Sequence, residues 1–101
     1  MGAAWNSAST NPLSQAFIKN YKAKYSNDPD QFAAQAYAGV YIMAEGLKKA
    51  NTTSDRKALR DGLGQVKDFP TLLGSFSFTP ERDANHQAVV QVVKDGQFAV
   101  Y

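Results

Sequence analysis

Apolar side chains recur at helical spacing near the start of the chain. The stripe falls at every fourth position, at Leu13, Phe17, Tyr21 and Tyr25. Asn11 can accept hydrogen bonds from free backbone amides, and Pro12 suits the first position of a helix. The pattern predicts an amphipathic helix that begins at Pro12 and ends at the turn cluster of residues 26–30.

The segment from Phe32 to Leu47 carries apolar side chains in nearly every helical direction. A helix of this composition is normally buried on most of its sides. Asp30 can cap its first turn, and Lys48 and Lys49 suit the negative end of the helix dipole. We therefore expect a second helix that is covered on most sides.

A third, weaker helix is expected after the loop of residues 51–53, with Thr53 or Ser54 as its cap. Its apolar stripe comprises Leu59, Leu63 and Val66, and the pair Phe69-Pro70 ends it. The apolar spacing then changes to two, at Leu72, Gly74, Phe76 and Phe78. This alternation is typical of a strand.

The last part of the chain predicts a β-hairpin. Residues 80–86 are expected to be a polar connection, and the valine-rich residues 88–93 favour a strand. Asp95-Gly96 predicts a tight turn because these residues tolerate positive φ angles. Residues 97–101 are the expected returning strand, and residues 1–11 a loop or the tail of a strand.

The expected elements do not cover one another. The second helix needs a wider sheet than these short strands provide, and an isolated hairpin is only marginally stable in water. We interpret the chain as part of a larger α/β fold. Two alternatives stay open: self-association through the first two helices, and a complete small α+β domain.

The composition is that of a globular protein. The 101 residues are 44% hydrophobic and 20% charged, which argues against a disordered tail. A net charge of +2 gives no electrostatic reason to expect nucleic acid as a partner. No stretch approaches the roughly 20 apolar residues of a membrane span, and residues 1–5 do not have the pattern of a signal peptide.

Residues that could carry catalysis are few. The single histidine, His86, lies in a polar loop, where a lone histidine is usually solvated. The chain has no cysteine, and its carboxylates lack the spacing of zinc or calcium ligands. Gly62 and Gly64 do not extend to a dinucleotide-binding loop, because Lys67 stands at the third glycine position. We therefore expect neither an enzyme nor a cofactor.

Aromatic residues are the better candidates for a binding site. Trp5 stands outside any periodic element, so it is expected either to line a ligand cleft or to cap the core. Phe32 opens the second helix and is expected to face either the core or the cleft. The helical tyrosines are expected in the core rather than in a site: Tyr21, Tyr25, Tyr37 and Tyr41.

The order of these motifs resembles the type I periplasmic solute-binding proteins, the branched-chain amino acid (Leu/Ile/Val) binding components of ABC transporters. Phe32-Ala33-Ala34-Gln35-Ala36-Tyr37 is similar to the opening of their commonest helix, although Ala38 replaces the usual acidic residue. The similarity runs in order through residues 11–25, 32–37, 44–50, 59–63, 68–69, 74–78, 83–85 and 89–98.

The resemblance implies a two-lobed α/β fold with a ligand cleft between the lobes. This chain would be its C-terminal fragment, seen alone as three helices followed by short strands and a C-terminal hairpin. Residues 1–78 would supply the helical part of the first lobe. Residues 79–101 would supply the crossing segment and the hairpin of the second lobe.

The resemblance also implies a function. The chain would belong to the substrate-binding component of an ABC importer for amino acids or related small solutes, outside the cytoplasm, with a membrane permease as partner. In this family, the position of Phe32 borders the ligand's side chain, and the loop of Trp5 lies close to the cleft. The alternative is a self-associating module, such as a homodimer, or a stand-alone mini-domain with no small-molecule ligand.

Overall fold

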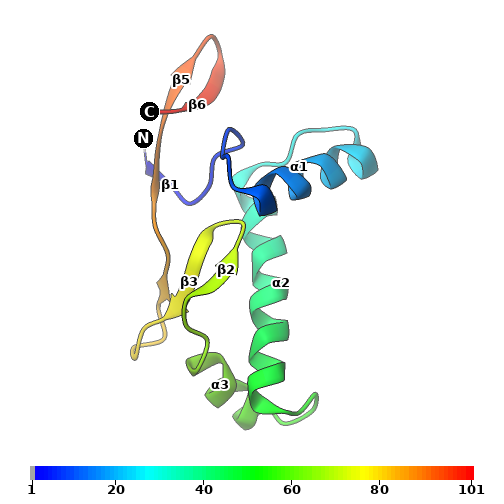
Figure 1. Cartoon of the computed structure of the whole chain (residues 1–101), viewed down its shortest axis with the longest axis vertical. Helices are drawn as coiled ribbons and strands as arrows, with labels where there is room; N and C mark the ends of the chain where they lie inside the picture. Colours follow the sequence, from blue (N-terminus) through cyan, green and yellow to red (C-terminus); the bar gives the residue numbers. More distant parts are fainter. Residues whose placement is uncertain (1) are drawn as a thin grey trace.

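The computed structural model describes residues 2–101 as three helices and six short strands (Figure 1). In chain order they are β1 (Gly2–Ala3), α1 (Pro12–Tyr25), α2 (Gln31–Ala50), α3 (Arg56–Gly64), β2 (Phe69–Thr71), β3 (Gly74–Phe78), β4 (Ala84–Asn85), β5 (Val89–Lys94) and β6 (Gln97–Val100). The predicted α/β class is confirmed, with three helices followed by short strands and a C-terminal hairpin.

Helices α1 and α2 begin at the capping residues that the sequence predicts. The side chain of Asn11 accepts a hydrogen bond from the backbone N–H of Leu13 at 3.0 Å. Asp30 accepts one from the N–H of Ala33 at 2.8 Å. Each helix closes on a residue in the left-handed conformation, which satisfies carbonyls of the last turn.

The cap of α3 is Asp55, and the prediction of Thr53 or Ser54 is wrong. The carboxylate of Asp55 accepts hydrogen bonds from the backbone N–H groups of Lys57 and Ala58, at 3.0 and 3.1 Å. A carboxylate also carries the negative charge that a helix N-terminus favours. Asp55 therefore satisfies two free amides with one side chain.

Helix α3 also ends earlier than predicted. It stops at Gly64, so Val66 lies beyond the helix, although it is completely buried. Phe69–Thr71 is strand β2 rather than a helix terminator. Pro70 pairs with Ser75 of β3, and β2 is an edge strand of its sheet. Proline, which has no N–H to donate, is tolerated on such an edge strand because one side of the strand has no partner strand.

Strands β2, β3 and β4 form an antiparallel sheet, here called the central sheet, beside α2 (Figure 1). The predicted strand is confirmed at Gly74–Phe78, where Phe76 is buried against the helices. Residues 80–86 were predicted to be a polar connection. This prediction is wrong for Ala84 and Asn85, because they form β4, in which Ala84 pairs with Phe78 of β3.

Strands β1, β5 and β6 form a second antiparallel sheet, here called the terminal sheet. The predicted hairpin is confirmed: Asp95 and Gly96 form its turn with φ angles of 53° and 78°. Gly2 pairs with Val90, so the start and the end of the chain lie side by side. Their pairing gives the hairpin a third strand.

Helix α2 is buried along one stripe only. Ala34, Ala38 and Ile42 pack into the core with Phe17 of α1 and Phe76 of β3. The prediction that α2 is covered on most sides is wrong within this chain. Other apolar side chains of the helix remain open to solvent, among them Val40, which is 71% exposed, and Met43.

The molecule is long for its size. Its radius of gyration is 15.1 Å, whereas a compact chain of this length has about 13 Å. The terminal sheet lies at one end and α3 at the other, with α2 running between them (Figure 1). Within residues 2–101, we find no helix whose length and apolar character would let it cross a membrane.

Candidate functional site

A pocket lies where the N-terminal loop, the start of α2 and the terminal sheet meet. We call it the Trp5 pocket, and its volume is about 220 Å³. Its lining residues are Trp5, Asn6, Ser7, Pro29, Asp30, Gln31, Phe32, Gln91 and Phe98. Both binding-site residues predicted from the sequence, Trp5 and Phe32, therefore lie on the same pocket.

Trp5 is held rigidly at this pocket. The indole is only 4% exposed, and its Nε1–H donates a 2.8 Å hydrogen bond to the hydroxyl of Ser14. Its ring meets that of Phe17 edge to face, with centroids 5.9 Å apart. The sequence left two roles open, the core and the cleft. Trp5 occupies both positions, since it belongs to the core cluster and lines the pocket.

Phe32 faces the pocket rather than the core. It is the second residue of α2 and remains 69% exposed. An exposed phenylalanine beside a pocket can contribute apolar contact area to a ligand. The helix fixes its backbone position, since the Asp30 cap holds the first turn.

The terminal sheet supplies residues that the sequence analysis missed. Phe98 of β6 and Gln91 of β5 line the pocket, although they stand far from Trp5 in the sequence. The side-chain amide of Asn6 donates a buried 2.9 Å hydrogen bond to Oε1 of Gln91. No local pattern signals such a pair, because it forms only when the two ends of the chain meet.

Two polar side chains of the pocket, Asp30 and Gln31, lie at the start of α2. Asp30 is the one charged residue among those that line it, and its Oδ1 accepts the N–H of Ala33. Gln31 accepts a hydrogen bond from the backbone N–H of Ala4 at 3.4 Å. The pocket thus combines three aromatic rings with one carboxylate and several amides, a lining suited to a small amphipathic molecule.

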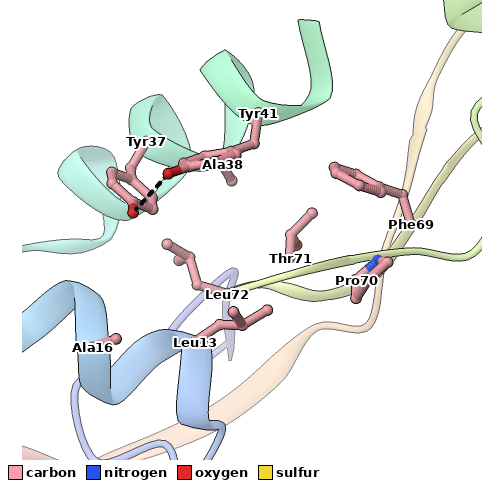
Figure 2. A pocket seen from close by; sticks show the side chains of 9 residues that line it. All are labelled: Leu13, Ala16, Tyr37, Ala38, Tyr41, Phe69, Pro70, Thr71 and Leu72. Carbon is pink, nitrogen blue, oxygen red and sulfur yellow. Dashed lines mark hydrogen bonds between the residues drawn. The ribbon is translucent and has the colours of Figure 1, made fainter. Parts of the chain in front are cut away.

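A second pocket, here called the tyrosine pocket, lies between α1, α2 and β2 (Figure 2). Its volume is about 160 Å³. The prediction that the tyrosines are core residues is wrong for Tyr25, Tyr37 and Tyr41, which are 54%, 40% and 52% exposed. Tyr37 and Tyr41 line this pocket. The hydroxyl of Tyr37 donates to that of Tyr41 at 3.3 Å. This hydrogen bond and partial burial raise the pKa of Tyr37 above its ordinary value.

The catalytic candidates remain dispersed. Within the part of the chain that the structure describes, no three His, Asp or Glu side chains come together as metal ligands would. His86 is half-buried, and its ring stacks on that of Phe76 with centroids 6.2 Å apart. The expectation that His86 is a solvated loop residue is therefore only partly right.

Comparison with known proteins places this geometry in a family. A family model described as "Periplasmic binding protein" matches residues 1–97. The chain is 31% identical over 77 residues to a Leu/Ile/Val-binding protein homolog of Brucella melitensis, a match that covers 75% of this chain and 20% of that protein.

Solved structures share the fold. A substrate-binding protein of an ABC transporter from Desulfitobacterium hafniense, in complex with Leu, superposes with a TM-score of 0.88 at 24% identity, over 99% of this chain and 30% of its own. A branched-chain amino acid transporter substrate-binding protein from Streptococcus pneumoniae, in complex with isoleucine, has a TM-score of 0.78 at 27% identity, over 96% and 27%. The chain thus spans less than a third of the length of these relatives.

Proposed function

Because the chain belongs to the periplasmic binding protein family, we propose that it forms part of a protein that captures a small solute and delivers it to the permease of an ABC importer. Proteins of this family bind their solutes and are not enzymes. The observation that carries the proposal is the Trp5 pocket, where Trp5 and Phe32 meet residues of the terminal sheet.

The solute class that we propose is a branched-chain amino acid or a related small molecule. The relatives named above bind leucine, isoleucine or valine according to their descriptions. In the Trp5 pocket, Phe32 and Phe98 offer apolar surface for an aliphatic side chain. The carboxylate of Asp30 offers negative charge for an ammonium group.

The lobes of the family fold would divide this chain. We assign residues 1–78 to the first lobe and residues 79–101 to the crossing segment and hairpin of the second lobe, with the Trp5 pocket at their boundary. The pairing of Gly2 with Val90 supports a chain that passes between lobes near its start. Closure of the lobes over the solute would then complete the site.

The site of action that we propose is outside the cytoplasmic membrane. The support is the family itself, which is described as periplasmic. A soluble receptor there would meet the permease from the outer side of the membrane.

A titration followed by NMR tests the solute proposal. L-Leucine added to the chain should shift the indole N–H resonance of Trp5 and the resonances of Phe32, with a Kd in the millimolar range or weaker. Binding should be weak because most of the relatives' length, and the contacts it would make, is not part of this chain. Phe32→Ala should remove the shifts, whereas Tyr25→Ala, an exposed residue outside the pocket, should retain them.

Two results would contradict the solute proposal. One is the absence of any shift at Trp5 and Phe32 with leucine, isoleucine and valine at tens of millimolar. The other is an unchanged response in Phe32→Ala. Micromolar binding by the chain alone would instead refute our inference that most contacts with the solute come from the part of the relatives' length that this chain does not span.

The second candidate function is self-association. It is favoured by the open apolar face of α2, which includes Val40 and Met43, and by the exposed valines of the hairpin. Light scattering after size exclusion distinguishes the two. A stable dimer that Val40→Gln dissociates would support the self-associating module, and a monomer at high concentration would exclude it.

A further inference from the structure

The tyrosine pocket is separate from the proposed solute site. Its lining residues are Leu13, Ala16, Tyr37, Ala38, Tyr41, Phe69, Pro70, Thr71 and Leu72, and none of them lines the Trp5 pocket. In Figure 2, α2 carries the tyrosines on one side, and Leu13 of α1 and Leu72, in the turn after β2, lie on the other. The pocket is therefore a second place where a small molecule could lie.

The walls of this pocket are fixed by hydrogen bonds between elements. The side chain of Asn11 donates to the backbone carbonyl of Thr71 at 3.2 Å. The hydroxyl of Ser14 donates to the carbonyl of Leu72 at 3.0 Å, and Ser14 is completely buried. These two bonds join the start of α1 to the end of β2 and to the turn that follows it, and so they fix the positions of two sides of the pocket.

The lining is apolar and carries no charge. Leucine, alanine, proline and phenylalanine side chains make up most of it. The hydroxyl of Thr71 is already used, since it donates to the carbonyl of Gly74 at 2.8 Å and accepts the N–H of Leu73 at 3.1 Å. The phenol groups of Tyr37 and Tyr41 are then the polar side-chain groups left for a ligand.

The two phenols have distinct roles. Tyr37 donates its hydroxyl proton to Tyr41, so the proton of Tyr41 can point to a ligand oxygen. None of the residues that line the pocket is an Asp, Glu, Lys, Arg or His, so the pocket offers no countercharge to an ion. The pocket therefore favours a neutral ligand with one hydrogen-bond acceptor on an apolar body.

The volume sets the size of the ligand. A dry apolar cavity of roughly 150 Å³ accommodates a benzene ring. The tyrosine pocket, at about 160 Å³, matches a six-membered ring with one small substituent. We propose that the tyrosine pocket binds a neutral, ring-sized alcohol or ketone, with the ring between Leu13 and Leu72 and its oxygen at the hydroxyl of Tyr41.

A ligand in the tyrosine pocket should change the surroundings of the Trp5 ring. The ring of Phe17 lies 4.8 Å from that of Tyr37 and 5.9 Å from that of Trp5, centroid to centroid. Ser14 likewise bonds both Trp5 and the carbonyl of Leu72. Since the chain has a single tryptophan, its fluorescence gives a clean second signal for binding at Tyr41.

Cyclohexanol is a suitable probe, because it is transparent where tryptophan is excited. Titration into the chain should give saturable NMR shifts at Tyr37 and Tyr41 with a Kd on the order of millimolar, and a parallel change in Trp5 fluorescence. Tyr41→Phe should raise the Kd about fivefold through loss of one hydrogen bond. Tyr25→Phe, on α1 and outside the pocket, should leave it unchanged.

A filling variant tests the location. Ala16→Leu places extra volume in the pocket and should abolish saturable binding. Ala23→Leu, at an exposed position of the same helix, should not. Urea unfolding of both variants would show that each remains folded, so that loss of binding is assigned to the pocket.

Charged analogues test the class. Cyclohexylammonium and cyclohexanecarboxylate carry the same ring and should bind at least tenfold more weakly than cyclohexanol, because the lining has no countercharge. The proposal is overturned if cyclohexanol gives only linear, unsaturable shifts, if Ala16→Leu binds as the unchanged chain does, or if an ion binds better than the alcohol. Trp5 responds to both pockets, so the sites are told apart by Phe32, which should shift with leucine, and by Tyr37 and Tyr41, which should shift with cyclohexanol.

Discussion

The indole Nε1–H of Trp5 and the hydroxyl of Ser14 form a buried hydrogen bond of 2.8 Å that joins the N-terminal loop to α1. The hydroxyl of Ser14 also donates a hydrogen bond of 3.0 Å to the backbone carbonyl of Leu72. One small side chain thereby positions the tryptophan of the Trp5 pocket and one wall of the tyrosine pocket.

Replacement of Ser14 should therefore cost stability. Ser14→Ala leaves the indole N–H and the Leu72 carbonyl without their partner in a buried place, at a cost of about 1–3 kcal/mol in the free energy of unfolding. Urea unfolding followed by Trp5 fluorescence measures it. Ser75→Ala, at an exposed position of β3, is the control. A loss no larger than that of the control would show that the hydrogen bonds do not hold the loop.

Glycines set the spacing between α2 and α3. A Cβ added at Gly62 would meet the backbone carbonyl of Gly46 and lie 2.9 Å from the backbone nitrogen of Ala50. Because backbone atoms cannot move aside cheaply, Gly62→Ala should destabilise the fold by about 1–3 kcal/mol.

Gly64→Ala supplies the matched control for that prediction. A Cβ at Gly64 meets nothing within 4 Å, so this change should be neutral or stabilise the chain by up to about 1 kcal/mol through higher helix propensity. Thermal unfolding of the two variants is the measurement. Equal effects of the two substitutions would refute the close approach of the helices.

Shortening a side chain should affect the free energy of unfolding differently on the two faces of α2. Ile42 is buried, and Ile42→Ala should cost roughly 2–5 kcal/mol because it leaves a cavity. Val40 is mostly exposed, and Val40→Ala should change the unfolding free energy by less than about 0.5 kcal/mol. Chemical unfolding at low protein concentration checks both. A large loss for Val40→Ala would indicate that this face is packed in solution.

The tyrosine pair predicts a response to alkaline pH. The pKa of Tyr37 is raised from 10.0, first by the hydrogen bond to Tyr41 and then by burial, so the folded state favours the protonated phenol. The resulting stability is fully present below pH 10 and is lost as the pH rises through the raised pKa of Tyr37.

Tyrosinate absorbance gives the measurement. In a pH titration, Tyr37 should ionise later than an unperturbed tyrosine, and Tyr41→Phe should bring its midpoint back toward 10.0. Tyr25→Phe removes a phenol outside the pair and should leave the late transition in place. A Tyr37 midpoint that Tyr41→Phe does not lower would contradict the hydrogen bond as the main cause.

Much of the fold could be predicted because its signals are local. Asn11 and Asp30 cap the helices that follow them, and Asp95-Gly96 makes the hairpin turn, since each acts through its own or adjacent backbone groups. The errors at α3 have a local cause too. Thr53, Ser54 and Asp55 are all residue types that cap helices, and capping propensity alone did not identify Asp55 as the cap.

The candidate site was predicted only in part. Trp5 was predicted as a site residue because it stands outside every periodic element. Phe32 was predicted because of the family resemblance. Phe98 and Gln91 carried no comparable signal, because their place in the Trp5 pocket depends on the pairing of β1 with β5. Tyr37 and Tyr41 were assigned to the core since a helical stripe does not reveal which of its flanks is covered.

The sequence by itself determined where the helices and the hairpin form, for those depend on caps, turn residues and the period of apolar side chains. It also indicated that α2 carries more apolar surface than this chain can cover. Only the tertiary structure decided which side chains share a pocket. Bringing Trp5, Phe32 and Phe98 together requires contacts between distant segments, and the free energy of those contacts depends on packing rather than on local sequence.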